Sequence, residues 1–192
     1  MALVMVRKIT LLSAILFLLH VFSLAASKPP VSGDAVATIK LPVPGNPDER
    51  KYLGLSSKDF FKIPQVKADI IVIEIFSLYC PQCQTAAPEV NALYQMIEEI
   101  SNFKDRIKMI GIGAGNSVLE VNAFREKHRV PFPLFPDQDF TIHNLLGEVR
   151  TPYFMIVKFD KDRNCQVIYA KEGAFGEAEN FLQQIIEAAG LK

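Results

Sequence analysis

The sequence predicts an α/β domain in which a central mixed β-sheet is flanked by helices. The apolar runs Ile70–Phe76 and Ile107–Ile112 have the length and composition of buried strands. Residues 81–100 lie between these runs and have helical periodicity. The chain ends in a predicted hairpin, residues 153–171, and an amphipathic helix, residues 177–189. Strands that alternate with helices and end in a hairpin are typical of a sheet with helices packed on it.

Length and composition predict one folded domain behind an export segment. A chain of 192 residues with 49% hydrophobic residues can bury one substantial core, which we place at residues 36–192. Residues 1–26 combine Arg7 and Lys8, a long apolar run and small residues, as an export signal does. Residues 9–26 also approach the roughly 20 residues that span a bilayer, so a membrane anchor is the alternative. Residues 27–35 are rich in proline and small residues and are predicted to be a linker.

The charge balance excludes a nucleic-acid surface. Residues 1–26 contain two basic residues and no acid, so the rest of the chain has two fewer basic residues than acidic ones. A nucleic-acid-binding domain carries a basic excess on one face. We therefore expect no nucleic-acid partner.

The remaining elements follow from local patterns. At the N-terminal end, residues 36–41 are predicted to form a strand and residues 42–48 a proline-rich turn. Residues 51–55 are predicted to return as a second strand. Ser56 or Ser57 is then predicted to cap a helix that continues through Phe61. Ser117 and Glu120 form a capping box for a helix to about Lys127. A short apolar stretch, residues 132–135, and a short helix, residues 139–146, precede the hairpin.

The main chemical motif is Cys80-Pro81-Gln82-Cys83, at the point where the first apolar strand passes into a helix. The free N–H groups and positive end of a helix stabilise a thiolate and lower the pKa of the first cysteine. The second thiol is close enough to close a small disulfide ring. This pattern favours dithiol–disulfide exchange. A structural disulfide and half of a zinc site are the alternatives, and the only further zinc ligand candidates, Cys165, His128 and His143, lack the spacing of a second half-site.

Glu74 interrupts the apolar strand six residues before Cys80. A carboxylate within a buried strand is costly unless it is paired, solvated or protonated. The sequence therefore predicts either a functional acid or a carboxylate that reaches water at the sheet edge.

These features together resemble the thioredoxin superfamily, over about residues 36–191. The resemblance depends on the Cys-x-x-Cys motif after a buried strand, on Pro88 five residues beyond Cys83, on Thr151-Pro152 at the start of a strand, and on the hairpin and helix at the end. The strand and helix inserted within residues 109–135, and the exported N-terminus, are similar to the TlpA/ResA-like branch. The expected architecture is a thioredoxin-like fold with an N-terminal strand or hairpin extension and a strand–helix insertion.

The resemblance implies a role for each site residue. Cys80 would attack a target disulfide, Cys83 would resolve the mixed disulfide, and Glu74 would accept the proton of Cys83. Pro152 would be a cis-proline that faces the cysteines, and the backbone of Thr151 would pair with an extended substrate segment. The implied protein is an exported, periplasmic or extracytoplasmic thiol-disulfide oxidoreductase without a cofactor. Its expected partners are protein disulfide or dithiol clients and a membrane thiol electron donor.

Three other activities are weighed against disulfide reduction. Gln82 supplies no cation, unlike the histidine of strongly oxidising Cys-Pro-His-Cys relatives, which favours a reductase over a disulfide donor. Ser77, Cys80 and Arg150 partly mimic a peroxiredoxin site. Cys80, Cys83 and a histidine such as His143 would be ligands for Cu(I).

Cys165 has no role in any of these activities. It is predicted to be either a small residue that fills space in the hairpin or an exposed thiol.

Overall fold

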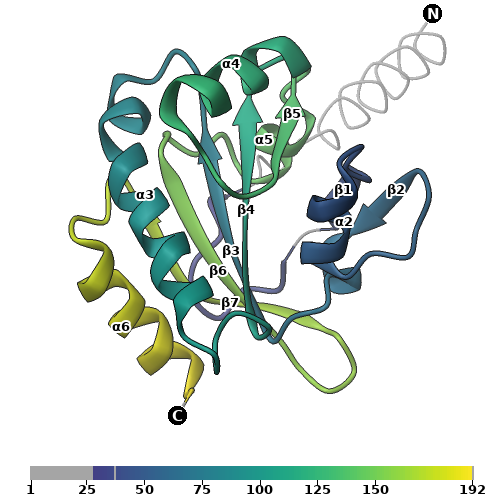
Figure 1. The fold of residues 1–192 in the computed structure, drawn as a ribbon, viewed down its shortest axis with the longest axis vertical. Coiled ribbons are helices and arrows are strands. Elements are labelled where there is room, and N and C mark those ends of the chain that lie inside the picture. Colours follow the sequence, from purple (N-terminus) through teal and green to yellow (C-terminus); the bar gives the residue numbers. More distant parts are fainter. Residues whose placement is uncertain (1–27, 37, 192) are drawn as a thin grey trace, which may run out of the picture.

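The computed structural model describes residues 28–36 and 38–191, and the predicted export segment at residues 1–26 lies outside them. Its centre is one five-stranded sheet (Figure 1). The strands are β3 (Ile70–Phe76), β4 (Ile107–Ala114), β5 (Leu134–Asp137), β6 (Tyr153–Phe159) and β7 (Cys165–Glu172). Within the described part of the chain, no helix has both the length and the apolar character needed to cross a membrane.

The sheet is mixed, as predicted, and its spatial order is β5-β4-β3-β6-β7. β3, β4 and β5 run parallel, while β6 pairs antiparallel with β3 and β7 pairs antiparallel with β6. Strand β3 is therefore central, with a hydrogen-bonded neighbour on each side. Its carboxyl end lies beside the start of β6, since the two strands run in opposite directions.

Both faces of β3 are buried, which explains its nearly continuous apolar sequence. Val72 and Phe76 point to a face covered by α3 (Pro81–Glu99), α4 (Val118–His128) and α6 (Ala178–Ala189). Figure 1 shows α3 and α6 side by side on this face. Ile73 and Ile75 point to the other face, which is covered by the N-terminal segments and α5 (Thr141–Leu145).

The predicted strand–helix insertion is confirmed. Ser117 caps α4, and its capping box with Glu120 is formed in both directions. The short apolar stretch after α4 becomes β5, which extends the sheet beside β4. The predicted final hairpin and helix are also present as β6, β7 and α6.

One predicted strand near the N-terminus is wrong. Residues 51–55 were expected to return as a strand, whereas α2 (Pro47–Leu53) covers most of this segment. Asn46 caps the helix by accepting a hydrogen bond from the N–H of Asp48 at 2.8 Å, and Pro47 occupies the first turn. Gly54 ends the helix in the left-handed conformation, with φ 65°. These local signals outweigh the alternation of a short apolar pattern.

The helix predicted after Ser56 or Ser57 is also wrong. Residues 60–62 form β2 (Phe60–Lys62), which pairs antiparallel with β1 (Lys40–Pro42). Phe61 is buried between exposed neighbours, so the burial has the period of a strand. A single 3-10 turn, η1 (Ile63–Gln65), follows.

Residues 31–36, at the end of the predicted linker, lie along the sheet. The N–H of Gly33 donates to the carbonyl of Val167 at 2.8 Å, and the N–H of Val36 donates to that of Cys165 at 3.1 Å. This segment therefore covers the edge of β7, which would otherwise be unpaired.

The capping role of Asn46 is testable. We expect Asn46→Ala to lower the free energy of unfolding by about 1 kcal/mol, because the cap hydrogen bond to Asp48 is lost. Asn46→Asp keeps a side-chain acceptor and should change stability little. Guanidinium unfolding of the full chain in mild detergent measures both. An alanine variant as stable as the wild type would contradict the capped helix.

Candidate active site

The two cysteines of the motif form a disulfide at the start of α3. Their Cα atoms are 5.3 Å apart. Cys80 is the N-cap residue and is partly exposed, whereas Cys83 is 0% exposed, one turn inside the helix. An attacking thiol needs access to a partner, and a resolving thiol does not. The burial therefore distinguishes the two sulfur atoms.

The Cys80 sulfur lies at the positive end of α3. The backbone N–H of Cys83 donates a hydrogen bond to Cys80 Sγ at 3.1 Å. Pro81, at the first helical position, has no N–H to leave unpaired. When the disulfide opens, this N–H and the positive end of the helix favour the thiolate of Cys80 over its thiol.

Thr151 and Pro152 come from a distant part of the chain to the same point. The peptide bond between them is cis. The carbonyl oxygen of Thr151 lies 3.3 Å from Cys80 Sγ, and the carbonyl of Pro152 accepts a hydrogen bond from the N–H of Gly173 at 2.8 Å. The antiparallel pairing of β3 and β6 causes this meeting, since it places the start of β6 beside the end of β3.

Glu74 is buried on the face of β3 that packs under α3. It is 3% exposed, and its cross-strand neighbours are Gly111 and Phe154. The flanking residues on this face, Val72 and Phe76, belong to the same buried cluster as Cys83. Because β3 is the central strand, a carboxylate in water at the sheet edge is excluded. Burial raises the pKa of Glu74 to about 8.

Asn116 is a site residue that the sequence analysis missed. Its side chain is 0% exposed and lies in the β4–α4 loop. Its Oδ1 accepts a hydrogen bond from the N–H of Leu78 at 2.8 Å, and its Nδ2 donates to Ser77 Oγ at 3.3 Å. Asn116 therefore fixes the loop that leads into Cys80. In the sequence it reads only as a turn residue, because its partners lie 38 and 39 positions away.

A second contact ties the same loop to α4. Tyr79 is 70% exposed, and its hydroxyl donates to the carboxylate of Glu120. The pKa of Glu120 is lowered because Tyr79 and then Ser117 donate hydrogen bonds to its carboxylate. The capping box of α4 thus also holds the residue before Cys80.

The other candidate residues make no hydrogen bond to Cys80 or Cys83 among the described residues. Arg150 is exposed and, among the described residues, its side chain makes no hydrogen bond or ion pair. His143 Nε2 is 2.9 Å from the carbonyl oxygen of Val149. Cys165 begins β7 at the opposite end of the sheet from Cys80, and burial raises the pKa of its thiol. Residues 28–36 and 38–191 contain no group of three or more histidine, cysteine or acidic residues arranged to hold a metal ion.

The buried carboxyl group predicts a specific pH dependence of stability. With a pKa of about 8 when folded and an ordinary value of 4.5, Glu74 binds more protons in the folded state than in the unfolded state between these pH values. Stability therefore falls as the pH rises from about 5 to about 8. We expect Glu74→Gln to gain about 3 to 5 kcal/mol over the wild type across this range, because glutamine does not titrate.

Guanidinium unfolding of the oxidised proteins at pH 5, 6, 7 and 8 measures this difference. Glu179→Gln, an exposed acid on α6, is the matched control and should follow the wild type. Parallel pH curves for Glu74→Gln and the wild type would show that the carboxyl group titrates normally.

Solved structures with the same fold are numerous. The chain is similar to a candidate thiol:disulfide interchange protein DsbE from Chlorobium tepidum, with 16% identity, a TM-score of 0.62, and coverage of 83% of this chain and 98% of that one. It is also similar to StoA from Bacillus subtilis, with 16% identity, a TM-score of 0.55, and coverage of 78% and 98%. A secreted Mycobacterium tuberculosis disulfide oxidoreductase homologous to E. coli DsbE matches with 14% identity, a TM-score of 0.53, and coverage of 68% and 90%.

These likenesses confirm the thioredoxin-like fold. No curated protein sequence matches the chain. A family model does match it, over residues 34–171, which include all of the strands from β1 to β6 and nearly all of β7. This range contains both cysteines, Glu74, Asn116 and the cis-proline, and it is more than half of the chain. The chain belongs to the AhpC/TSA family.

Proposed function

We propose that this protein is an exported thiol-disulfide oxidoreductase that reduces disulfides in extracytoplasmic protein clients. The observation that carries the proposal is the Cys80–Cys83 disulfide, with one partly exposed and one buried cysteine, at a helix start that faces Thr151 and Pro152. The similar structures described as a disulfide oxidoreductase and a thiol:disulfide interchange protein support the same chemistry.

The reaction begins with the reduced protein. The Cys80 thiolate attacks one sulfur of a client disulfide, forms a mixed disulfide and expels the other client sulfur as a thiolate. The Cys83 thiolate then attacks Cys80 Sγ, forms the Cys80–Cys83 disulfide and expels the second client thiolate. The client gains two electrons that the protein thiols lose, and the two protons of the protein thiols end on the client thiols.

Glu74 would take the proton from Cys83 before the second attack. A carboxylate with a pKa near 8 has an affinity for protons close to that of a thiol, so transfer in either direction costs little. Both groups belong to the same buried layer between β3 and α3. Burial keeps bulk water from competing for this proton.

Thr151 and Pro152 would hold the client beside Cys80. The Thr151 carbonyl lies at the sulfur, so an extended client segment that pairs with this backbone brings its own disulfide to the same point. Pro152 has no N–H, which leaves Thr151 as the residue that pairs.

Reduction needs a supply of electrons. Because exported compartments generally oxidise thiols, a dithiol partner must restore the reduced pair, and a membrane thiol donor fits this role. Residues 1–26 would provide export, as a cleaved signal or as an anchor. Gln82 adds no cation beside Cys80, which favours reduction over disulfide donation.

The peroxidase and copper alternatives fit the geometry less well. A peroxidase that used Ser77, Cys80 and Arg150 would need the arginine to bind at the sulfur, and among the described residues the Arg150 side chain makes no hydrogen bond to Ser77 or Cys80. A copper site would need a histidine beside the two thiols, and residues 28–36 and 38–191 place no third histidine, cysteine or acidic ligand with them. Disulfide exchange, by contrast, gives a role to both Cys83, as the resolving thiol, and Pro152, beside the client segment.

Cysteine variants test the proposal. We expect Cys80→Ser to abolish reduction of insulin disulfides by the dithiothreitol-reduced protein. Cys83→Ser should stop turnover at the first step and accumulate a mixed disulfide with the client, visible on a non-reducing gel, because no resolving thiol remains. Cys165→Ser, at the far end of the sheet, should retain wild-type activity.

The contrary results are equally specific. A mixed disulfide through Cys165, or none in Cys83→Ser, would rule out the assigned roles. Faster turnover of hydrogen peroxide than of insulin disulfides would make the protein a peroxidase.

A further inference from the structure

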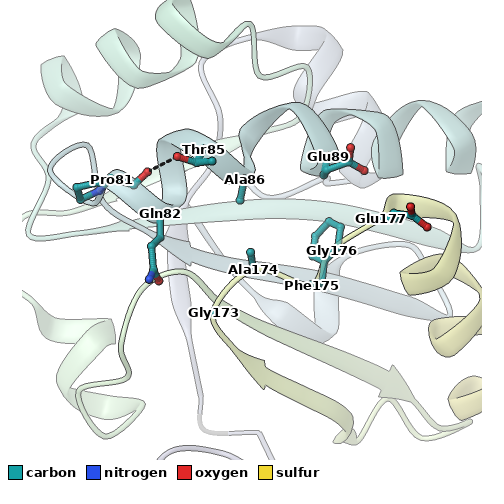
Figure 2. A pocket seen from close by; sticks show the side chains of 10 residues that line it. All are labelled: Pro81, Gln82, Thr85, Ala86, Glu89, Gly173, Ala174, Phe175, Gly176 and Glu177. Carbon is teal, nitrogen blue, oxygen red and sulfur yellow. Dashed lines mark hydrogen bonds between the residues drawn. The ribbon is translucent and has the colours of Figure 1, made fainter.

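A groove of about 610 Å³ lies beside the redox motif, between α3 and the segment that joins β7 to α6. Figure 2 shows the side chains that line it. They are Pro81, Gln82, Thr85, Ala86, Glu89, Gly173, Ala174, Phe175, Gly176 and Glu177. One end of this groove lies beside the reacting sulfur. Two of its lining residues show this: Pro81 follows Cys80 directly, and the N–H of Gly173 is hydrogen-bonded to the carbonyl of Pro152.

One face of α3 forms a wall along the groove. Gln82, Ala86 and Glu89 are spaced by four and then three residues, so they lie in one row on the helix. The eight residues from Gln82 to Glu89 span seven helical steps, a rise of about 10 Å. The groove therefore extends from the redox motif to a position about two turns along the helix.

The middle of the groove is apolar. Ala86 and Ala174 face it from the two sides, and their small side chains leave the space open (Figure 2). Phe175 is held in place by stacking on Phe181, with ring centroids 4.2 Å apart, and by an edge contact with Phe154 at 4.8 Å. This fixed aromatic wall suits an aliphatic chain.

The far end carries two carboxylates, Glu89 and Glu177 (Figure 2). Glu89 Oε2 accepts a hydrogen bond from the N–H of Ala178 at 2.9 Å, and Glu177 Oε2 accepts one from Asn180 Nδ2 at 2.7 Å. Each carboxylate has a second oxygen, and neither is in an ion pair with any described residue. None of the described residues that line the groove is basic.

We propose that this groove binds a lysine or arginine side chain of the client, close in sequence to the client cysteine. Its methylene groups would lie along Ala86 and Phe175, and its cation would meet Glu89 and Glu177. The inference rests on the proposed function and adds to it a substrate class, disulfides flanked by a basic residue. Both carboxylates are exposed, so the preference is electrostatic and weakens with salt.

Matched peptide disulfides test the preference. Each peptide carries a fluorophore and a quencher that separate on reduction. One of the four positions nearest the cysteine, two before it and two after it, is lysine, norleucine or glutamate. We expect at least one position at which the full-length reduced protein shows a kcat/KM about three- to tenfold higher for lysine than for glutamate at low salt. The ratio should fall towards one at high salt.

The double variant Glu89→Gln with Glu177→Gln is the decisive comparison. Glutamine keeps the acceptors for Ala178 and Asn180, so α6 remains held while both charges are removed. The lysine-to-glutamate ratio should fall below twofold in this variant. Glu179→Gln makes the same type of change on α6 outside the groove and should leave the ratio unchanged.

The outcomes separate the inference from the proposed function. Reduction of the peptides with no lysine preference, or with a preference that survives in the double variant, overturns the groove assignment and leaves the proposed function standing. Reduction of neutral 2-hydroxyethyl disulfide but of no peptide overturns the groove assignment and leaves standing only the thiol–disulfide chemistry of the proposed function. If the protein reduces neither, the proposed function fails and the inference fails with it.

Discussion

Burial of β3 on both faces is the constraint on which the rest of the structure depends. The strand pairs with β4 on one side and with β6 on the other, and the antiparallel pairing brings the start of β6, with its cis-proline, to the point where β3 ends. Burial removes Glu74 from water, which raises the pKa of its carboxyl group. The loop after β3 then has to turn at once into α3, and Cys80 becomes the residue that caps the helix. The partly exposed cysteine, the buried cysteine and the buried acid are consequences of one strand position.

The loop before Cys80 is held in place by two residues from another segment of the chain. Asn116 binds it from the β4–α4 loop, and Tyr79 binds Glu120 in the cap of α4. Both supports come from the segment inserted between β4 and β5. The insertion therefore positions the redox motif as well as extending the sheet. The opposite side of the motif is left open as the groove, where small residues line α3 and the β7–α6 segment.

The sequence predicted the parts whose signals are local and strong. The apolar run of β3, the helical stripe of α3 and the capping box of α4 all recur in the structure. It failed between residues 42 and 62, where elements are short and the apolar alternation of residues 51–55 competed with the cap signals of Asn46 and Gly54. At the site, the cysteine motif and Glu74 could be recognised along the chain. Asn116 and the groove could not, because they arise only when segments far apart in sequence are brought together.

The central claim is that Cys80 and Cys83 act as a reductant. Their reduction potential tests it most directly, measured by equilibrating the full chain with glutathione or dithiothreitol redox buffers and trapping the free thiols. A helix start without an added cation predicts a value near that of thioredoxin, about −270 mV. A value near −120 mV, as in a strong oxidant, would contradict the account and make the protein a disulfide donor.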